Sequence, residues 1–228
     1  MITFFDNEIG MEPLFLTLKI AVLSIVLHLI TGIVTGYFFL NKKSYVSRTM
    51  DILVTIPLFF PPIAVGFILL LMLGRNSIIG ILFKRLFGID FIFTFIGLLI
   101  ASYVAGLPLI VKSIQNAVES FDTNIVEASY SLGKSKLYTY FLVIIPNIKG
   151  FITSGALLAF GRSIGEVGIT LMLGGDIQGK TDTISIAIYN AVFSAEYAKA
   201  GFYSIVLGII SFFALLFFKN INKTSTRL

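Results

Sequence analysis

The sequence has no cysteine and only one histidine, His28, among its 228 residues. The lack of cysteine excludes disulfide bonds and thiolate metal sites, although it does not identify a cellular compartment. One histidine is too few for a histidine-based metal centre. Charged residues make up only 13% of the chain, whereas a soluble domain carries about 25%. These shortages leave little material for a soluble catalytic core.

What the chain has instead is apolar sequence, with 57% hydrophobic residues and a mean hydropathy of +0.96. Whole windows of about 20 residues are nearly free of charge, which is the length that a helix needs to cross a bilayer core. Continuous apolar runs, rather than alternating ones, exclude a β-barrel. The prediction is a single all-α transmembrane domain over residues 1–228. Five segments are predicted to span: 14–40, 52–73, 91–111, 137–161 and 201–218.

Basic residues orient these spans through the positive-inside rule. The N-terminus, which is acidic at Asp6, Glu8 and Glu12, is expected outside, and the C-terminus in the cytoplasm. The same acidic start lacks the positive region of a cleavable signal peptide. The cytoplasmic side would hold Lys42, Lys43, Arg48, Lys112, Lys134, Lys136, Lys219, Lys223 and Arg227, against Arg75, Lys84, Arg85, Lys180 and Lys199 outside.

Two connecting segments stand out in this topology. Residues 112–136 would form a long cytoplasmic loop, and residues 162–200 would begin and end outside. Within the second segment, 163–173 and 184–193 are too apolar for a solvated loop and short for a pair of spans. We expect this segment to re-enter the protein interior, where irregular backbone is tolerated if it is buried or lines a cavity. Residues 183–199 could instead form a sixth transmembrane helix.

The cytoplasmic loop contains the start and stop signals of a short helix. Asp122 or Thr123 can serve as its N-cap, and Gly133 suits the position just after its last turn. One face of this helix carries a small, shallow apolar stripe at helical spacing, which consists of Ile125, Ala128, Ser129 and Leu132. The stripe could dock on another protein or rest on the chain's own helix ends, and periodicity alone does not distinguish the two.

A longer pattern covers the same loop. Glu127-Ala128-Ser129 is followed after three residues by Gly133 and, after nine more, by residues 143–146, which read V-I-I-P. This resembles the EAA loop of ABC importer permeases (E-A-A, three residues, G, nine residues, I-x-L-P), from which Ser129, Val143 and Ile145 depart mildly. The resemblance implies a coupling helix that sits in a cleft of a cytoplasmic ATPase subunit. Its coupling residues would be Glu127, Ala128, Ser129, Leu132 and Gly133.

Other segments narrow the resemblance to molybdate-type permeases, with tungstate and sulfate permeases as close relatives. Gly175 and Asp176 depart from the expected pattern, and sulfate permeases tend to be longer. Together with the EAA loop the similar segments cover roughly residues 50–195. They are residues 58–67, 73–76, 159–168, 171–183 and 186–189.

The resemblance implies a type I importer permease fold with five to six transmembrane helices per subunit, in the cytoplasmic (inner) membrane of a prokaryote. It implies a homodimer that works by alternating access with two cytoplasmic ABC ATPase subunits and an external oxyanion-binding protein. ATP and Mg²⁺ would bind to the ATPase partner, so this chain is expected to be a transport subunit with no cofactor, no metal and no catalytic residue. The scattered basic residues argue against nucleic acid. Alternatives are a tungstate or sulfate permease, a permease for another small solute, or a membrane protein with a structural role, which the EAA pattern disfavours.

One motif points to a different class of protein. Residues Gly174–Thr181 match G-x-x-x-x-G-K-[ST], the phosphate-binding loop of nucleotide-binding proteins, and 167–173 could pass for the preceding strand. The predicted orientation puts this loop outside, where ATP is scarce. Five spans also leave no length for a βαβ core, and no convincing acidic strand for Mg²⁺ follows. We favour a glycine-rich turn that re-enters or caps the pore.

Charges near the end of the fourth span define a candidate translocation path. Arg162 and Glu166 lie four residues apart and could simply neutralise each other as an intrahelical pair, the interpretation that we favour. Alternatively, Arg162 could contribute to the anion path while Glu166 holds its orientation. A dianion would be better served by small hydroxyls such as Ser154 and Ser163 and by the backbone N–H groups of the glycine-rich turn.

Overall fold

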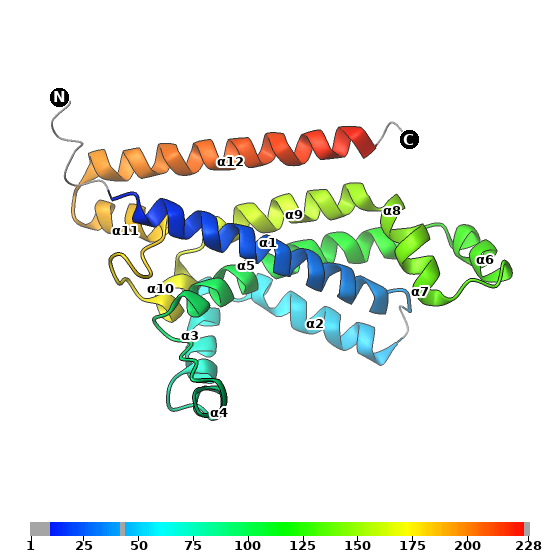
Figure 1. Cartoon of the computed structure of the whole chain (residues 1–228), viewed down its shortest axis with the longest axis horizontal. Coiled ribbons are helices and arrows are strands. Elements are labelled where there is room, and N and C mark those ends of the chain that lie inside the picture. Colours follow the sequence, from blue (N-terminus) through cyan, green and yellow to red (C-terminus); the bar gives the residue numbers. More distant parts are fainter. Residues whose placement is uncertain (1–9, 42–43, 226–228) are drawn as a thin grey trace.

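The computed structural model describes residues 10–41 and 44–225, with side chains up to Ile221. The regular elements within these residues are helices (Figure 1). Three of them are long and apolar enough to cross a membrane. The number rises to as many as five if each of two bent helix pairs, within residues 62–87 and 136–164, is one span. The chain is thus a multi-pass, all-α membrane protein, as predicted. The three long helices are α1 (Glu12–Phe38), α5 (Phe95–Glu119) and α12 (Tyr197–Ser225).

These helices and α9 (Lys149–Ile164) run along one common axis, with α5 at the centre (Figure 1). Leu98, Ala101 and Ile114 of α5 are fully buried by their neighbours. Small residues make the close approach possible. A Cβ on Gly32 of α1 would lie 2.8 Å from Cδ1 of Ile114, a distance that forces a side chain to shift. Tight packing of this kind is the main force that associates helices inside a membrane.

His28 lies at the contact between α1 and α5. Its side chain is fully buried, and its Nε2 is 2.8 Å from the carbonyl oxygen of Tyr103. The imidazole also stacks on the Tyr103 ring, with 5.3 Å between ring centroids. The single histidine is therefore a packing residue that fixes two helices against each other.

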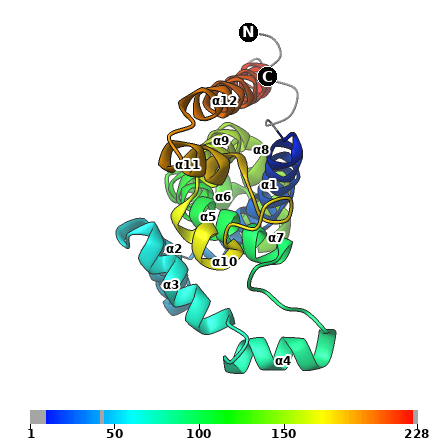
Figure 2. The ribbon, with the colours of Figure 1, turned by 90° about the vertical axis from the view of Figure 1, so that its left-hand side faces the viewer.

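The second predicted span, 52–73, is wrong as a single helix. It is divided into α2 (Tyr45–Phe59), which follows the bundle axis, and α3 (Pro62–Leu73), which crosses it (Figures 1 and 2). Phe60 and Pro61 between them have extended backbone, with ψ of 142° and 137°. A residue that precedes proline avoids the helical region, and two successive prolines also remove two N–H donors. The helix therefore stops instead of bending.

The fourth predicted span, 137–161, is also divided. Its two halves meet at an angle of 72°, with Ile148 at the break and Pro146 two residues before it. Proline removes a backbone donor, so the helical hydrogen-bond pattern changes here. The first half consists of α7 (Lys136–Tyr138), the π-helix η1 (Thr139–Ile144) and α8 (Ile145–Asn147).

The loop predicted for residues 112–136 begins later than expected. Helix α5 continues to Glu119, so Lys112 lies within the helix. There its ammonium forms an ion pair with Asp51 of α2, which compensates the lysine charge without a loop. The remaining connection holds α6 (Thr123–Ser131), the short helix that the sequence predicts.

The predicted segment 162–200 holds two short helices between the end of α9 and the start of α12 at Tyr197. Helix α9 continues two residues beyond 162 and ends at Ile164. Helix α10 (Gly168–Gly174) packs against α3 and α5, and α11 (Ile184–Phe193) packs against α12 and α1. Ile169, Leu173, Ile184 and Ile186 are buried at 2% exposure or less. With ten residues, α11 is too short to be a complete sixth span.

The bundle has two distinct ends (Figure 1). Helix α6 lies at one end, together with the start of α2 and the C-terminal part of α12, which carry Arg48 and Lys219. Helices α10 and α11 lie at the opposite end. We call these the inner end and the outer end, following the orientation predicted from charge. Lys42, Lys43, Arg227, Asp6 and Glu8 lie outside the described residues.

Candidate functional site

Helix α6 at the inner end has well-defined caps. The Asp122 carboxylate accepts a hydrogen bond from the N–H of Asn124 at 2.8 Å, which identifies Asp122 as the N-cap. Gly133 has a φ of +75°, as expected for the residue after the helix. The N–H of Gly133 bonds to the Tyr130 carbonyl and that of Lys134 to the Ser129 carbonyl, at 2.9 and 3.1 Å. This is the Schellman arrangement, which satisfies the last carbonyls of the helix.

The apolar stripe of α6 is divided between two surroundings. Ser129 is buried, and its Oγ lies 2.8 Å from Oγ1 of Thr139 in η1. Because the Thr139 hydroxyl donates to the Ser135 carbonyl at 3.1 Å, Ser129 is the donor. Leu132 is 77% exposed and Ile125 45% exposed. One edge of the helix therefore rests on the chain itself, while the apolar side chains of Leu132 and Ile125 stay exposed.

Glu127 borders a cleft of about 490 Å³ between α6 and the inner ends of α1 and α5. Both charged and apolar side chains line this cleft, including Lys136 and Phe121. Glu127, Ala128 and Gly133 are exposed like Leu132. Four of the five predicted coupling residues thus face outward, and Ser129 alone is an anchor.

At the outer end of α9, Arg162 and Glu166 form the predicted ion pair. The Glu166 side chain is only 1% exposed, whereas that of Arg162 is 38% exposed. The second carboxylate oxygen of Glu166, Oε1, accepts a hydrogen bond from the N–H of Ile169 in the first turn of α10 at 2.9 Å. Glu166 thus holds together the end of α9, the break and the start of α10, and a carboxylate at a helix N-terminus is favourable.

The structure does not bring the two predicted path serines together. Ser154 is exposed on α9, whereas Ser163 is buried on the opposite face of the same helix. The Ser163 hydroxyl donates to the Ser102 carbonyl of α5 at 2.7 Å. Its hydrogen is therefore occupied in a contact between helices and is not free for an anion.

The segment before the glycine-rich turn is the helix α10 and not a strand. Thr181, which in a phosphate-binding loop would reach Mg²⁺, is fully buried and accepts the N–H of Ile177 at 3.0 Å. The turn lies beside a cleft of about 300 Å³ that is lined by carboxylates and by Lys199. Negative charge beside the turn opposes a nucleotide phosphate. The carboxylates are those of Glu12, Asp176, Asp182 and Glu196.

Asp182 is a partly buried carboxyl group of this cleft that has a shifted pKa. Burial raises its pKa to about 6, and the neighbouring Asp176 and Glu12 act in the same direction, while Lys199 acts against them. One of its oxygens, Oδ1, is buried and has no hydrogen-bond partner among the described residues. The outer cleft is therefore an electrostatically costly place for a further negative charge.

One charged pair was not anticipated from the sequence. Asp51 of α2 and Lys112 of α5, 61 residues apart, form an ion pair in which both side chains are about one-third exposed. The sequence did contain a signal for this pair, because an acidic and a basic residue each lie beside a long apolar segment and a charge there needs a partner. Which of them meet depends on the packing of α2 on α5.

These features define a helical membrane protein with the largely exposed short helix α6 at its inner end and the short helices α10 and α11 at its outer end. Its fold is that of a type I ABC importer permease. A chain of a bacterial alginate ABC transporter, solved in complex with alginate pentasaccharide-bound periplasmic protein, matches it with a TM-score of 0.76. The match covers 99% of this chain and 82% of that one, at 17% identity.

The chain belongs to the family described as binding-protein-dependent transport system inner membrane component, whose model matches residues 28–226. It is 34% identical to the molybdenum transport system permease protein ModB of Azotobacter vinelandii, over 92% of each chain. It is 31% identical to a putative molybdenum transport permease of Bacillus subtilis, over 93% of each. A probable sulfate transport permease of Chlorella vulgaris is 27% identical over 92% of this chain and 79% of its own length.

Proposed function

We propose that this chain is the channel-forming permease of an ATP-driven importer for molybdate in the cytoplasmic membrane of a prokaryote. The observation that carries the proposal is the similarity to molybdenum transport permeases over more than nine-tenths of the chain. The sulfate permease is less similar and longer, which favours molybdate as cargo. Tungstate is a tetrahedral dianion of nearly the same size, so it remains the alternative to test.

In this proposal two copies of the chain form a homodimer with the pore between them. Two cytoplasmic ATPase subunits, which bind ATP and Mg²⁺, receive the exposed residues of α6. Ser129 fastens α6 to η1, and η1 continues through α8 into α9. A displacement of α6 is thereby passed to the helix that carries Arg162. An external binding protein would deliver the oxyanion to the outer mouth, and the pore would open alternately to the two sides.

Within the path we assign different roles to the four candidate residues. Ser154 and the partly exposed Arg162 would face the cargo, and a guanidinium with free N–H groups suits an oxyanion. Ser163 and Glu166 are buried and hydrogen-bonded, so they would hold the α5–α9 contact and the α9–α10 break. Few cargo contacts are an advantage, because transport requires that binding in the pore be weak enough for release.

The decisive experiment measures ATP hydrolysis by the full complex in proteoliposomes that contain the external binding protein. Molybdate, tungstate and sulfate are added separately. Leu132→Asp places a charge on the exposed side of α6, and Leu132→Met is its matched control because it keeps an apolar side chain there. We expect molybdate to stimulate hydrolysis in wild type and Leu132→Met but not in Leu132→Asp. Stimulation by sulfate alone would refute the cargo, and full stimulation of the assembled Leu132→Asp complex would refute the coupling role of α6.

A further inference from the structure

Helix α4 (Ile78–Phe87) lies apart from the bundle, at the tip of the arm that α3 forms (Figure 2). It is nevertheless a complete helix with its own caps. The Ser77 hydroxyl accepts the N–H of Gly80 at 2.9 Å, and Gly88 ends the helix with a φ of +68°. Its packing partner is α3. The position of α4 is therefore not explained by burial in the core of the subunit.

The apolar side chains of α4 are exposed. Ile78 is 87% and Leu86 65% exposed, and Leu82 and Phe87 are exposed as well. A protein surface in water rarely carries so many large apolar side chains on one short helix. An apolar environment must therefore cover this helix, which leaves lipid or a second copy of the chain.

The direction of α4 favours lipid at the membrane boundary. In Figures 1 and 2, α3 and α4 lie across the axis of the spans, so α4 is oriented in the plane of the membrane. Soon after α4, the chain starts α5 at Phe95. The Lys19 ammonium lies 4.7 Å from the Phe95 ring centroid, so a charge is present at the level where this span begins. Charged lysines near span ends mark the boundary of the hydrocarbon layer.

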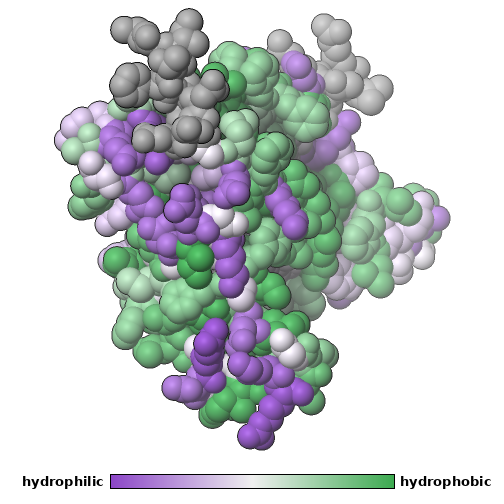
Figure 3. Space-filling model, turned by 60° about the vertical axis from the view of Figure 1, so that its left-hand side comes forward, coloured by the Kyte–Doolittle hydropathy of each residue, from purple (hydrophilic) through white to green (hydrophobic). Residues whose placement is uncertain are grey.

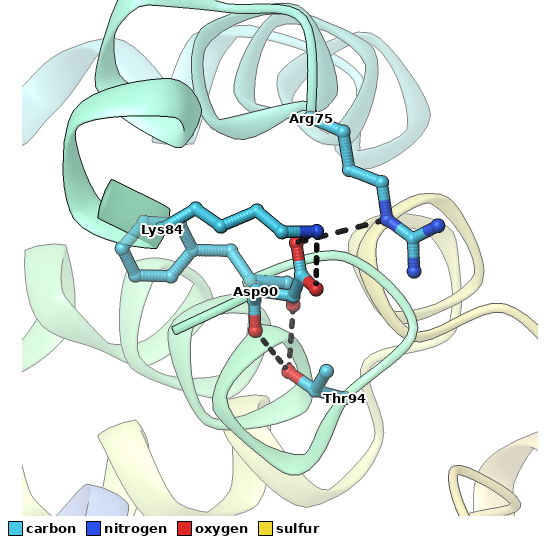
Figure 4. A network of polar contacts seen from close by, with 5 residues as sticks. Arg75, Lys84, Asp90 and Thr94 are labelled. Carbon is cyan, nitrogen blue, oxygen red and sulfur yellow. Dashed lines mark hydrogen bonds and ion pairs between the residues drawn. The ribbon is translucent and has the colours of Figure 1, made fainter. Parts of the chain in front are cut away.

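The charges around α4 indicate which lipids it meets. Arg75 and Lys84 share one carboxylate, that of Asp90, at 3.7 and 3.2 Å (Figure 4). Within the part of the chain that the structure describes, Arg85 has no ion pair. Of the three cations on and beside α4, two therefore share the Asp90 carboxylate and Arg85 has no ion pair among the described residues. In Figure 3, hydrophilic side chains gather at the lower tip of the molecule, beside a hydrophobic flank.

We propose that α4 is an interfacial helix that binds anionic phospholipid in the outer leaflet. Its apolar side chains insert among the upper parts of the acyl chains, and Arg85, with Lys84 and Arg75, binds lipid phosphate. A second copy of this chain would instead cover α4 with protein, an outcome that the quenching test below distinguishes from lipid. The lipid phosphate supplies a partner charge for Arg85 directly. This role adds a lipid contact to the transport function and does not depend on the identity of the cargo.

The chain contains no tryptophan, so a single introduced one reports on its own surroundings. We would reconstitute the full-length chain with Phe87→Trp in vesicles of lipids brominated either high or low on the acyl chain. We expect stronger quenching by the high position. Phe213→Trp in the exposed middle of α12 calibrates depth and should be quenched more by the low position. If Phe87→Trp is not folded, Leu86→Trp provides the same test.

The charge requirement is tested in the same vesicles by comparing brominated phosphatidylglycerol with brominated phosphatidylcholine. We expect a preference for the anionic lipid at Phe87→Trp, reduced about fivefold by Arg85→Gln and retained by Arg85→Lys. Lys199→Gln is the distant control, since Lys199 pairs with Glu196 at 3.2 Å. Stronger quenching by the low position, no quenching, or equal quenching by both headgroups would each overturn the proposal. The first would indicate a spanning helix and the second a contact with protein or water.

Discussion

The hydroxyl of Ser129 lies 2.8 Å from that of Thr139 and fastens the short helix α6 to the π-helix η1. Ser129→Ala removes this donor and should lower the free energy of unfolding by about 1 kcal/mol. Ser129→Leu should cost about 1–3 kcal/mol, because the site is buried and the larger side chain must displace η1. Thermal unfolding of the purified permease checks both values. Equal melting temperatures for the two variants would contradict the anchoring role.

Two glycines of the bundle provide a matched pair. A Cβ on Gly106 would lie 2.5 Å from Oγ of Ser163, 2.6 Å from Cε1 of His28 and 2.7 Å from the Ala159 carbonyl oxygen. Gly106→Ala should therefore separate α5 from α1 and α9 and destabilise the fold by about 1–3 kcal/mol. A Cβ on Gly161 meets nothing within 4 Å, so Gly161→Ala should be neutral or stabilising by up to about 1 kcal/mol.

The same thermal measurement distinguishes these two glycines. A melting temperature for Gly106→Ala at or above that of Gly161→Ala would show that the three helices are not packed as described. Transport activity should follow the same order, because α9 carries the candidate path residues.

Glu166 should contribute more to the free energy of unfolding than its ion pair with Arg162 alone would. Glu166→Ala removes the partner of Arg162 and the acceptor for the Ile169 N–H, and we expect a loss of about 3 kcal/mol. This is at the low end for a buried pair, because Arg162 reaches solvent. Glu166→Gln keeps an acceptor and should cost less. If Arg162→Ala costs as much as Glu166→Ala and the double variant costs no more, the ion pair and not the cap is the stabilising element.

The stability of the outer cleft should depend on pH through Asp182. Its pKa of about 6 lies above the ordinary value, so the folded chain holds this proton more tightly than the unfolded chain. The corresponding stability is present at low pH and is lost as the pH rises through about 4 to 6. Asp182→Asn removes the charge, so it should raise the melting temperature at about pH 7.5 and lose this advantage near pH 4. An equal effect of the substitution at both pH values would contradict this assignment.

Much of the architecture was predictable from local sequence. Long uncharged segments identify the membrane class, since a helix must satisfy its own backbone in lipid. The caps of α6 at Asp122 and Gly133, and the pairing of Arg162 with Glu166, involve residues within one or two turns. Interactions of this range depend on helix geometry, so the sequence alone specifies them. The segment 184–193 was recognised as apolar for the same reason, and α11 covers it.

Other features depend on how distant helices meet. The division of 52–73 was signalled by Pro61 and Pro62, but the new direction of α3 is set by its packing on α10. Lys112 was assigned to a loop because the apolar segment ends at Val111, and the partner that keeps it within a helix, Asp51, is 61 residues away. Whether Ser129 or Leu132 of the same stripe would be covered depended on the position of η1.

The sequence by itself determined the class of the protein, the short helix α6 and the local ion pair, because these follow from composition and from contacts a few residues apart, and the resemblance of its motifs indicated the family. Only the tertiary structure decided which hydroxyls are occupied, which carboxylates gather in the outer cleft, and that α4 lies across the spans. The physical reason is that burial, desolvation and long-range pairing depend on which helices share a boundary.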